Sequence, residues 1–315
     1  MASSRQLERP VVEEDLGRMA IFLEKHGAFY HPSRLLVAVK DQTIFFVVNV
    51  AASKNGRKAF SREVKALEHI NDQRPFGWFP KVYSYASGEL PMFLGDWFDG
   101  FHEFHLTRRS GSNEPAIAVW NGAATRCLLS ETQEAGLYRN ASMVMTACYD
   151  PITSCQIFPW HHAAGDFVIR IEAESVAVRL ITVRGYTRIA GFGPEPDNER
   201  SVLDALVFFF IHLSMRMRLD RIDGVSEVAW ASDRCIAPMT DGFFQGLDLT
   251  ARMNGFPETF PETFRHYFNH HDGTVLLAIA RRIAETFFDQ RTEEYRLIDR
   301  HLAGHVQGLR RLLAA

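Results

Sequence analysis

Two β-rich runs that follow each other almost without a gap constrain this chain more than any other feature of its sequence. Residues 34–40 read RLLVAVK and residues 43–51 read TIFFVVNVA, so only Asp41 and Gln42 separate them. Two runs rich in β-branched and aromatic residues with a two-residue connection are typical of a tight β-hairpin. We therefore expect an antiparallel sheet in the first third of the chain.

The residues before this hairpin predict a helix. Leu16, Met19 and Leu23 recur near the spacing of one helical face within residues 1–30. We therefore expect an amphipathic helical lead-in ahead of the sheet.

A helix and two further strands are expected after the hairpin. A polar loop at 53–58 leads into a helix that Ser61 can cap. Its apolar stripe consists of Val64, Leu67 and Ile70. Residues 81–85 and 91–96 then predict two strands. The order strand, strand, helix, strand, strand over residues 34–96 predicts a small sheet with one helix packed against it.

Beyond a linker near residues 97–101 the sequence predicts a different arrangement of elements. Residues 116–129 and 131–150 predict two helices, and residues 167–171 with 176–183 predict a second short hairpin.

The last third of the chain predicts a helical region with an aromatic core. Ser201 and Asp204 resemble a capping box for a helix that runs through Arg218, and two or three more helices are expected within residues 261–313. Much of the chain's total of 25 Phe lies here: Phe208, Phe209, Phe210, Phe243, Phe244, Phe256, Phe260, Phe264, Phe268, Phe287 and Phe288. Because phenylalanine buries a large area without a polar atom, this concentration predicts a core between helices.

Charge and hydropathy narrow the functional classes. The net charge is −3, without the basic excess of a general nucleic-acid binder. The longest apolar run, Ala205–Met215, is shorter than the about 18 residues that span a bilayer, and residues 1–14 lack the apolar segment of a secretory signal. The four cysteines (Cys127, Cys148, Cys155 and Cys235) show neither a C-x-x-C motif nor a framework spacing, which favours free thiols. We expect a cytoplasmic protein that binds neither nucleic acid nor membranes.

Six segments carry a resemblance to a known fold. In chain order they are the strand at 43–51, the helix with Glu63, the segment MFLGDWFDG at 92–100, a long helix at 136–150, the run WHHAAGD at 160–166, and LITV at 180–183. In order and spacing, though not in strict motifs, the chain resembles the protein-kinase-like fold over about residues 30–300. The resemblance is greatest to the aminoglycoside phosphotransferase and choline kinase branch.

The resemblance implies an α+β fold with two lobes. Residues 1–96 would form an amino lobe of helical lead-in, antiparallel sheet and one helix, and residues 97–101 a hinge. Residues 102–315 would form a mainly helical carboxy lobe, with a catalytic-loop-like hairpin at 157–183.

The resemblance also implies five cofactor-binding positions. Asn49 stands where the phosphate-binding lysine is expected, and Glu63 where its glutamate partner is expected. Asp96 and Trp97 stand in the hinge segment that receives adenine on backbone groups, and Thr182 stands at the position of the last metal-binding aspartate. Only Glu63 keeps the residue type of the family.

The catalytic loop departs from the family in the same way. His161 occupies the position of the base-like aspartate, if Gly165 and Asp166 align with the family's Gly-Asn pair. Asp166 then stands in place of the metal-binding asparagine and could still ligate a cation. His161 or His162 could act as a general base, because imidazole titrates near neutral pH.

Three functional interpretations remain open. The first is a degenerate, pseudokinase-like protein with a binding or regulatory role, which would take a nucleotide, another small molecule or a protein partner. The second is an atypical ATP-dependent phosphotransferase acting on a small hydroxyl-bearing molecule, with ATP and Mg²⁺ as cofactors and Lys40 or Lys54 in place of the missing lysine. The third is a histidine- or metal-dependent enzyme on an unrelated fold.

Other polar clusters are expected to be structural. His102 and His105 could share a helical face but lack the H-E-x-x-H spacing. Arg216, Asp220 and Asp223 have the spacing of ion pairs within one helix. A last group consists of His266, His270, His271 and Asp272, which suit the end of a helix and a turn.

Overall fold

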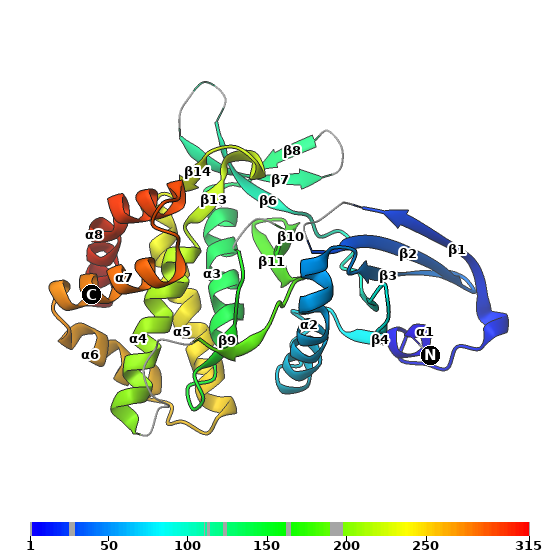
Figure 1. Ribbon diagram of the computed structural model, residues 1–315, viewed down its shortest axis with the longest axis horizontal. Helices are drawn as coiled ribbons and strands as arrows, with labels where there is room; N and C mark the ends of the chain where they lie inside the picture. Colours follow the sequence, from blue (N-terminus) through cyan, green and yellow to red (C-terminus); the bar gives the residue numbers. More distant parts are fainter. Residues whose placement is uncertain are drawn as a thin grey trace. The chain divides into compact units, whose positions relative to one another are not determined.

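The computed structural model of the chain describes residues 2–24, 29–109, 111, 114–121, 125–161, 165–189 and 198–314. They form an α+β protein with small antiparallel sheets and a helical carboxy-terminal part (Figure 1).

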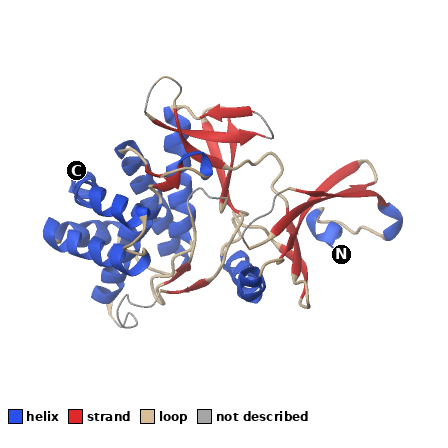
Figure 2. Ribbon diagram, turned by 45° about the horizontal axis from the view of Figure 1, so that its top comes forward, coloured by secondary structure: helices blue, strands red, loops and turns tan. Residues whose placement is uncertain are grey.

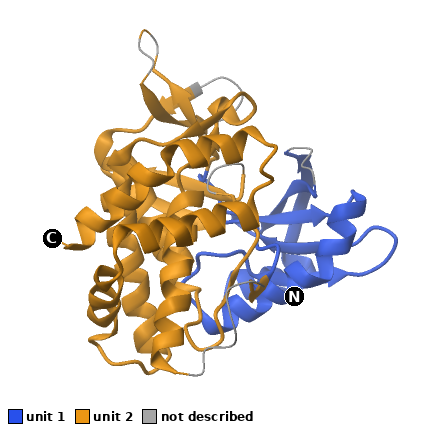
Figure 3. Ribbon diagram, turned by 60° about the vertical axis from the view of Figure 1, so that its left-hand side comes forward, with its two compact units in different colours: residues 1–101, 180–185 blue, residues 102–179, 186–315 orange. Residues whose placement is uncertain are grey.

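The chain divides into two units, which Figure 3 distinguishes by colour. The first unit comprises Met1–Phe101 together with Leu180–Gly185, and the second comprises His102–Arg179 with Tyr186–Ala315. The short segment Leu180–Gly185 thus belongs to the first unit, although the sequence places it in the carboxy lobe. Its backbone joins the first unit directly, because Leu180 N–H donates to the carbonyl oxygen of Trp78 at 3.0 Å.

The first unit is built on one five-stranded sheet of order β1-β2-β3-β5-β4. The strands are β1 (Leu16–Leu23), β2 (His31–Val39), β3 (Gln42–Val50), β4 (Val82–Ala86) and β5 (Met92–Asp96). Every neighbouring pair is antiparallel. The expected hairpin is confirmed as β2 and β3, with Val39 opposite Gln42 across a turn in which Lys40 has a φ of 53°.

The expected helical lead-in is wrong. Within residues 2–24, only α1 (Ala2–Gln6) and a single 3₁₀ turn, η1 (Glu13–Asp15), are helical, and the residues of β1 form a strand instead. A continuous apolar run fits either structure by its pattern alone. In the structure these residues pair with β2 instead, from Met19 opposite Val37 to Leu23 opposite Ser33.

Helix α2 (Lys54–Gln73) covers one face of this sheet, where Phe60 packs against Phe93 of β5 at a ring distance of 6.4 Å. The expected cap at Ser61 is wrong, because the hydroxyl of Ser53 accepts the Gly56 N–H at 2.9 Å and starts the helix within the predicted loop. The predicted apolar stripe of Val64, Leu67 and Ile70 is confirmed as buried. The opposite face of the sheet has its own core of Val37, Val39, Ile44 and Phe46.

The second unit begins with a three-stranded sheet, β6 (Phe104–Arg108), β7 (Pro115–Asn121) and β8 (Thr125–Leu128). The helix expected over 116–129 is therefore wrong. The run Ala116–Val119 is buried throughout, so periodicity could not separate a strand from a helix there. Its β-branched residues, Ile117 and Val119, favour the strand.

Three two-stranded sheets complete the β-structure that is described in the second unit. They are β9 (Cys155–Ile157) with β12 (Tyr186–Arg188), β10 (Phe167–Glu172) with β11 (Ser175–Leu180), and β13 (Leu219–Arg221) with β14 (Val228–Trp230). The second predicted hairpin is confirmed as β10 and β11.

Among the described residues of the second unit, six α-helices lie together (Figure 2). They are α3 (Glu131–Ala147), α4 (Glu199–Arg216), α5 (Ile236–Met253), α6 (Phe260–His270), α7 (Gly273–Phe287) and α8 (Glu293–Ala314). The capping box expected at Ser201 is wrong: Asn198 caps α4 by accepting the Ser201 N–H at 3.0 Å. Asp204 instead accepts a hydrogen bond from the hydroxyl of Tyr267 at 2.6 Å.

The phenylalanine-rich helices share an aromatic core, as the sequence predicts. Phe210 lies 4.4 Å from Phe243, 5.9 Å from Phe264 and 5.6 Å from Phe268, measured between ring centroids. These rings join α4, α5 and α6 in one cluster.

Helices α3 and α5 approach each other at backbone distance. A Cβ added at Gly242 of α5 would lie 1.9 Å from the carbonyl oxygen of Arg139, and one at Gly246 would lie 2.6 Å from that of Met143. Across the same contact, Thr250 donates its hydroxyl to the carbonyl oxygen of Thr146 at 3.0 Å. Glycine therefore sets the distance between these two helices.

In the described part of the chain, no helix combines the length and the apolar character needed to cross a membrane.

Gly242→Ala is expected to lower the free energy of unfolding by about 1–3 kcal/mol, because α3 and α5 must separate to admit the methyl group. Gly304 of α8 is the matched control, because a Cβ there meets no atom within 4 Å. Gly304→Ala should stabilise the protein by about 0.5–1 kcal/mol, since alanine favours a helix interior over glycine. Denaturant unfolding measures both, and equal effects of the two variants would contradict the close contact.

Candidate functional site

The residues that the sequence marks as functional fall into two groups. Asn49, Glu63, Asp96, Trp97 and Thr182 all belong to the first unit, because the segment 180–185 joins it. His161 and Asp166 belong to the second unit. His162 lies outside the described residues.

Glu63 is the centre of the first group. It lies on the buried face of α2 with 1% of its surface exposed, and its Oε1 accepts the backbone N–H of Val183 at 3.2 Å. A second bond joins the same two segments, from the Nε of Arg62 to the carbonyl oxygen of Arg184 at 3.0 Å. The half-buried Thr182 is thereby held beside α2.

A phenol is the next neighbour of the Glu63 carboxylate. Burial raises the pKa of Tyr30, and the negative charge of Glu63 raises it further. The positive charges of Arg184 and Arg62 act in the opposite direction. Glu63 thus has a backbone amide and a protonated phenol as neighbours, and the charges of two arginines act on that phenol.

Asn49 lies on the face of the sheet that α2 covers. It stands opposite Phe93 in the register of β3 and β5, and directly opposite residues share a face. Its side-chain oxygen is buried, without a hydrogen-bond partner among the described residues. An amide at this position adds no positive charge to the surroundings of Glu63.

The side chain of Asp96 has a structural role. Its carboxylate accepts the backbone N–H of Lys81 at 2.9 Å and the hydroxyl of Tyr83 at 2.6 Å. Burial raises the pKa of Tyr83, and the bond to Asp96 raises it further. Asp96 therefore fastens β4 to β5.

Trp97 contacts an arginine. The guanidinium carbon of Arg34 lies 5.6 Å from the centre of the Trp97 ring, 5.4 Å from that of Phe22 and 5.7 Å from that of Phe45. Glu24 pairs with the same guanidinium at 2.8 Å. Such contacts between a guanidinium and aromatic rings are cation–π interactions.

Arg34 shares a sheet face with Asn49. Arg34 stands opposite Val47, and Val47 lies two residues from Asn49 on β3. Since opposite residues share a face and side chains alternate along a strand, all three point to one side of the sheet. A guanidinium and three aromatic rings therefore cover this side.

In the second unit, Asp166 closes the loop that the sequence marks as catalytic. Asp166 is 1% exposed, and its Oδ2 accepts the backbone N–H of His161 at 2.7 Å. Trp160 is buried beside it, with its ring 6.0 Å from that of Phe167, and Gly165 has a φ of 76°. His161 itself is exposed. This carboxylate thus shapes the loop.

A buried arginine supports the same loop. Arg216 donates to the carbonyl oxygen of Trp160 at 3.3 Å and to the Nε2 of His212 at 2.7 Å, and its guanidinium carbon lies 5.0 Å from the Phe158 ring. Burial lowers the pKa of Arg216 to about 10 and lowers that of His212 well below its usual range. The expected helical pair of Arg216 with Asp220 is wrong, because α4 ends at Arg216.

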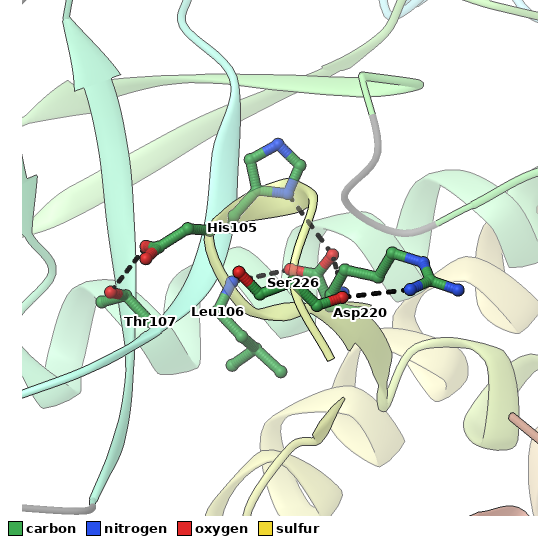
Figure 4. A network of polar contacts seen from close by, with 7 residues as sticks. His105, Leu106, Thr107, Asp220 and Ser226 are labelled. Carbon is green, nitrogen blue, oxygen red and sulfur yellow. Dashed lines mark hydrogen bonds and ion pairs between the residues drawn. The ribbon is translucent and has the colours of Figure 1, made fainter. Parts of the chain in front are cut away.

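Asp220 instead joins two strands of the second unit (Figure 4). Its carboxylate accepts the Leu106 N–H at 2.6 Å and lies 3.3 Å from the Nδ1 of His105. Next to it, Thr107 donates its hydroxyl to Asp223 at 2.8 Å. The helical face expected for His102 and His105 is also wrong, since His105 lies in β6 and His102 forms an isolated bridge with Ile169.

The His105–Asp220 pair has the composition of a catalytic dyad but is closed to substrate. His105 is 8% exposed, and the edge of the Trp120 ring lies against it at 5.8 Å between centroids. A Cβ on Gly224 would lie 2.9 Å from its Nε2. The turn at Gly224 thus covers the nitrogen that a general base would use, and the pair holds β6 to β13.

A second buried network joins α4 to α8, and no sequence pattern indicated it. The Nη1 of Arg218 lies 3.2 Å from the Nδ1 of His305, whose Nε2 lies 2.8 Å from the Oγ of Ser214. Arg218 also donates to the carbonyl oxygen of Ala231 and, at 2.6 Å, to Asp233. The serine and the histidine are 91 positions apart.

The proton positions in this network exclude a serine nucleophile. A guanidinium only donates, so Nδ1 of His305 accepts and Nε2 carries the hydrogen. Nε2 therefore donates to Ser214, whose hydroxyl donates to the carbonyl oxygen of Ile211 at 2.8 Å. A nucleophilic serine needs the reverse, a histidine that accepts its proton.

The histidines near residue 270 contact their own helix. The Nδ1 of His270 lies 2.7 Å from the carbonyl oxygen of His266, and the Nδ1 of His271 lies 3.0 Å from that of Tyr267. Asp272 caps α7 by accepting the N–H groups of the next turn. Among the residues that the structure describes, no group of three or more His, Cys, Asp or Glu side chains is placed to hold a metal ion.

No model of a known protein family matches the sequence, and no curated protein matches it. The chemistry of the two units is therefore argued from their own residues.

Asp166→Ala is expected to lower the free energy of unfolding by about 1–3 kcal/mol, because the backbone N–H of His161 loses its buried acceptor. Asp166→Asn is the matched variant and should cost less, since its carbonyl oxygen can still accept. Denaturant unfolding of the two variants measures the difference. A larger loss for Asp166→Asn would show that the negative charge, and not the loop bond, is what the site requires.

His305 is expected to make the free energy of unfolding depend on pH. Burial, and next the charge of Arg218, lower the pKa of His305 from 6.5 to about 3 in the folded protein. Between these values only the unfolded chain binds the proton, so the free energy of unfolding falls as the pH drops below 6.5. His305→Gln offers an acceptor and a donor without this titration.

Unfolding experiments between pH 7 and pH 4 test this effect. His305→Gln should reduce the number of protons taken up on unfolding by about one. His212, whose pKa is lowered in the same direction, should keep part of the acid sensitivity. Parallel pH profiles of variant and parent would refute the assignment.

Proposed function

We propose that this protein is a kinase-like protein with a degenerate nucleotide site, which acts by binding another molecule in a regulatory role and not by transferring phosphate. The observation that carries the proposal is the environment of Glu63. Phosphoryl transfer on a kinase-like fold needs a lysine that holds the phosphates and pairs with this glutamate. Here Asn49 replaces that lysine, and the carboxylate accepts the N–H of Val183.

Arg34 provides independent support. On a kinase-like fold, the sheet face that carries the lysine position receives the nucleotide. The corresponding face here is covered by Arg34, which Glu24 and three aromatic rings hold in place. A bound adenine would have to displace this side chain and its cation–π contacts.

The residues present do not fit a magnesium–nucleotide complex. Thr182 offers a hydroxyl where a carboxylate would be required, and Asp166 uses one carboxylate oxygen to hold the backbone of His161. Mg²⁺ is bound through carboxylates and substrate phosphates. With Asn49 and Thr182 in place of the family's lysine and second carboxylate, these two positions would not neutralise the charge of a triphosphate.

Thermal unfolding with ATP, ATP plus Mg²⁺, and Mg²⁺ alone tests this function. We expect no rise of the melting temperature with any of the three, whereas a ligand at 100 times its dissociation constant would add about 2.7 kcal/mol. Stabilisation that requires both ATP and Mg²⁺ would contradict the proposal and support the atypical phosphotransferase. A stoichiometric transition metal in the purified protein would support the metal-dependent enzyme instead.

A further inference from the structure

The outer strand of the first unit presents an open apolar edge. β1 is the last strand in the sheet order and, within the described residues, pairs with β2 alone. Four of its large apolar side chains are strongly exposed: Met19 by 62%, Ile21 by 67%, Phe22 by 44% and Leu23 by 55%. Natural proteins usually protect such edges, because an open edge is a template for pairing with another strand.

The backbone groups that point outward belong to Met19, Ile21 and Leu23. The N–H of Glu24 donates to the carbonyl oxygen of Pro32 at 3.1 Å, so Glu24 is directed toward β2. In an antiparallel pair, residues alternate between bonding to the partner strand and pointing away from it. Ala20 and Phe22 therefore face β2 with their backbone groups, and the three residues between and beside them face the open edge.

These three residues are complementary to themselves. An antiparallel pairing about a two-fold axis at Ile21 places Ile21 opposite Ile21, and Met19 opposite Leu23 at both ends. Each of these pairs exchanges two N–H···O bonds and brings apolar side chains together on one face. Ala20 then stands opposite Phe22 on the other face, which pairs a small side chain with a large one.

The charged residues at the two ends of the segment favour the same antiparallel register about Ile21. Arg18 precedes this segment and Glu24 follows it, and both are exposed. Pairing about Ile21 brings Arg18 of each copy opposite Glu24 of the other, whereas parallel pairing would place Arg18 beside Arg18. Glu24 already contacts Arg34 through Oε1, which leaves Oε2 to accept the second arginine.

An irregularity in the pairing marks one end of the paired segment. The register with β2 shifts between Leu16 and Met19. Such a shift interrupts regular pairing. The regular segment therefore starts at Met19, which agrees with a two-fold axis at Ile21.

We propose that two copies of this chain associate by antiparallel pairing of their β1 strands about Ile21, which joins two five-stranded sheets into one. This interface is isologous, because the same surface of each copy forms both sides. The interface involves none of the residues around Glu63, although it shares Phe22 and Glu24 with the cluster around Arg34. Arg18→Glu leaves that cluster intact, so its effect on dimerisation is separate from the proposed function.

Charge reversal at the two ends of the segment tests the interface on the full chain. Sedimentation of the wild type should give twice the monomer mass of 35.9 kDa. Arg18→Glu and Glu24→Lys should each raise the dimer dissociation constant by roughly tenfold or more, because every charge contact becomes a like-charge pair.

An equal mixture of the two variants should dimerise again. In the mixed dimer, the negative charge introduced in the first variant meets the positive charge introduced in the second. At the other end of the interface, the unchanged Glu24 of the first variant meets the unchanged Arg18 of the second. Opposite charges therefore face each other at both ends.

Lys58→Glu, a reversal on the exposed side of α2, is the matched control and should leave the dissociation constant unchanged. Hydrogen exchange gives a second readout that does not depend on a variant: the amides of Met19, Ile21 and Leu23 should gain protection as the concentration rises. A wild type that stays monomeric at every soluble concentration would overturn the proposal. A dimer that both charge reversals leave intact, or variants that fail to associate on mixing, would overturn it as well.

Discussion

The carboxylate of Glu63 is the interaction on which the first unit depends. A buried carboxylate is costly unless charges or hydrogen bonds compensate it. Helix α2 carries Glu63 on its buried face. The carboxylate accepts a hydrogen bond from the N–H of Val183, which lies 120 positions away in the sequence. The hydrogen bond to Glu63 joins the segment Leu180–Gly185 to the first unit, together with those from Leu180 to Trp78 and from Arg62 to Arg184.

The same principle organises the second unit, where polar groups are buried in closed networks. Asp166 accepts the backbone N–H of His161, and Asp220 fastens β6 to β13. Ser214 of α4 and the following Arg218 both contact His305 of α8. Each network contains residue types that enzymes use. In each, these groups form hydrogen bonds that join separate segments of the chain, so the networks stabilise the fold.

The elements that could be predicted from the sequence are those whose signals lie within a few neighbouring residues. The hairpin of β2 and β3 was predictable because a two-residue connection and β-branched runs act within a few positions. β1 and β7 were not. Leu16, Met19 and Leu23 have a helical spacing that misled at β1, and the continuous apolar run of β7 fits a helix or a strand equally well. The cap at Ser53 was missed because a polar run at a helix start has the composition of a loop.

The residues of the candidate site also fall into some that the sequence could predict and some that it could not. The order of elements marked Glu63, Asn49 and Asp166, but no local pattern revealed Arg34 in its cage of aromatic rings or the pairing of Ser214 with His305. These contacts join residues of different elements, and a single sequence carries no record of them.

The central claim is that the backbone N–H of Val183, and not a nucleotide-dependent contact, holds the carboxylate of Glu63. Hydrogen exchange at the amide of Val183 tests it most directly, in the wild type with and without magnesium–ATP and in Glu63→Ala. The account predicts strong protection in the wild type, unchanged by the nucleotide and lost in Glu63→Ala while the amides of the neighbouring β3 stay protected. An unprotected Val183 amide in the wild type, or protection that Glu63→Ala leaves intact, would contradict it.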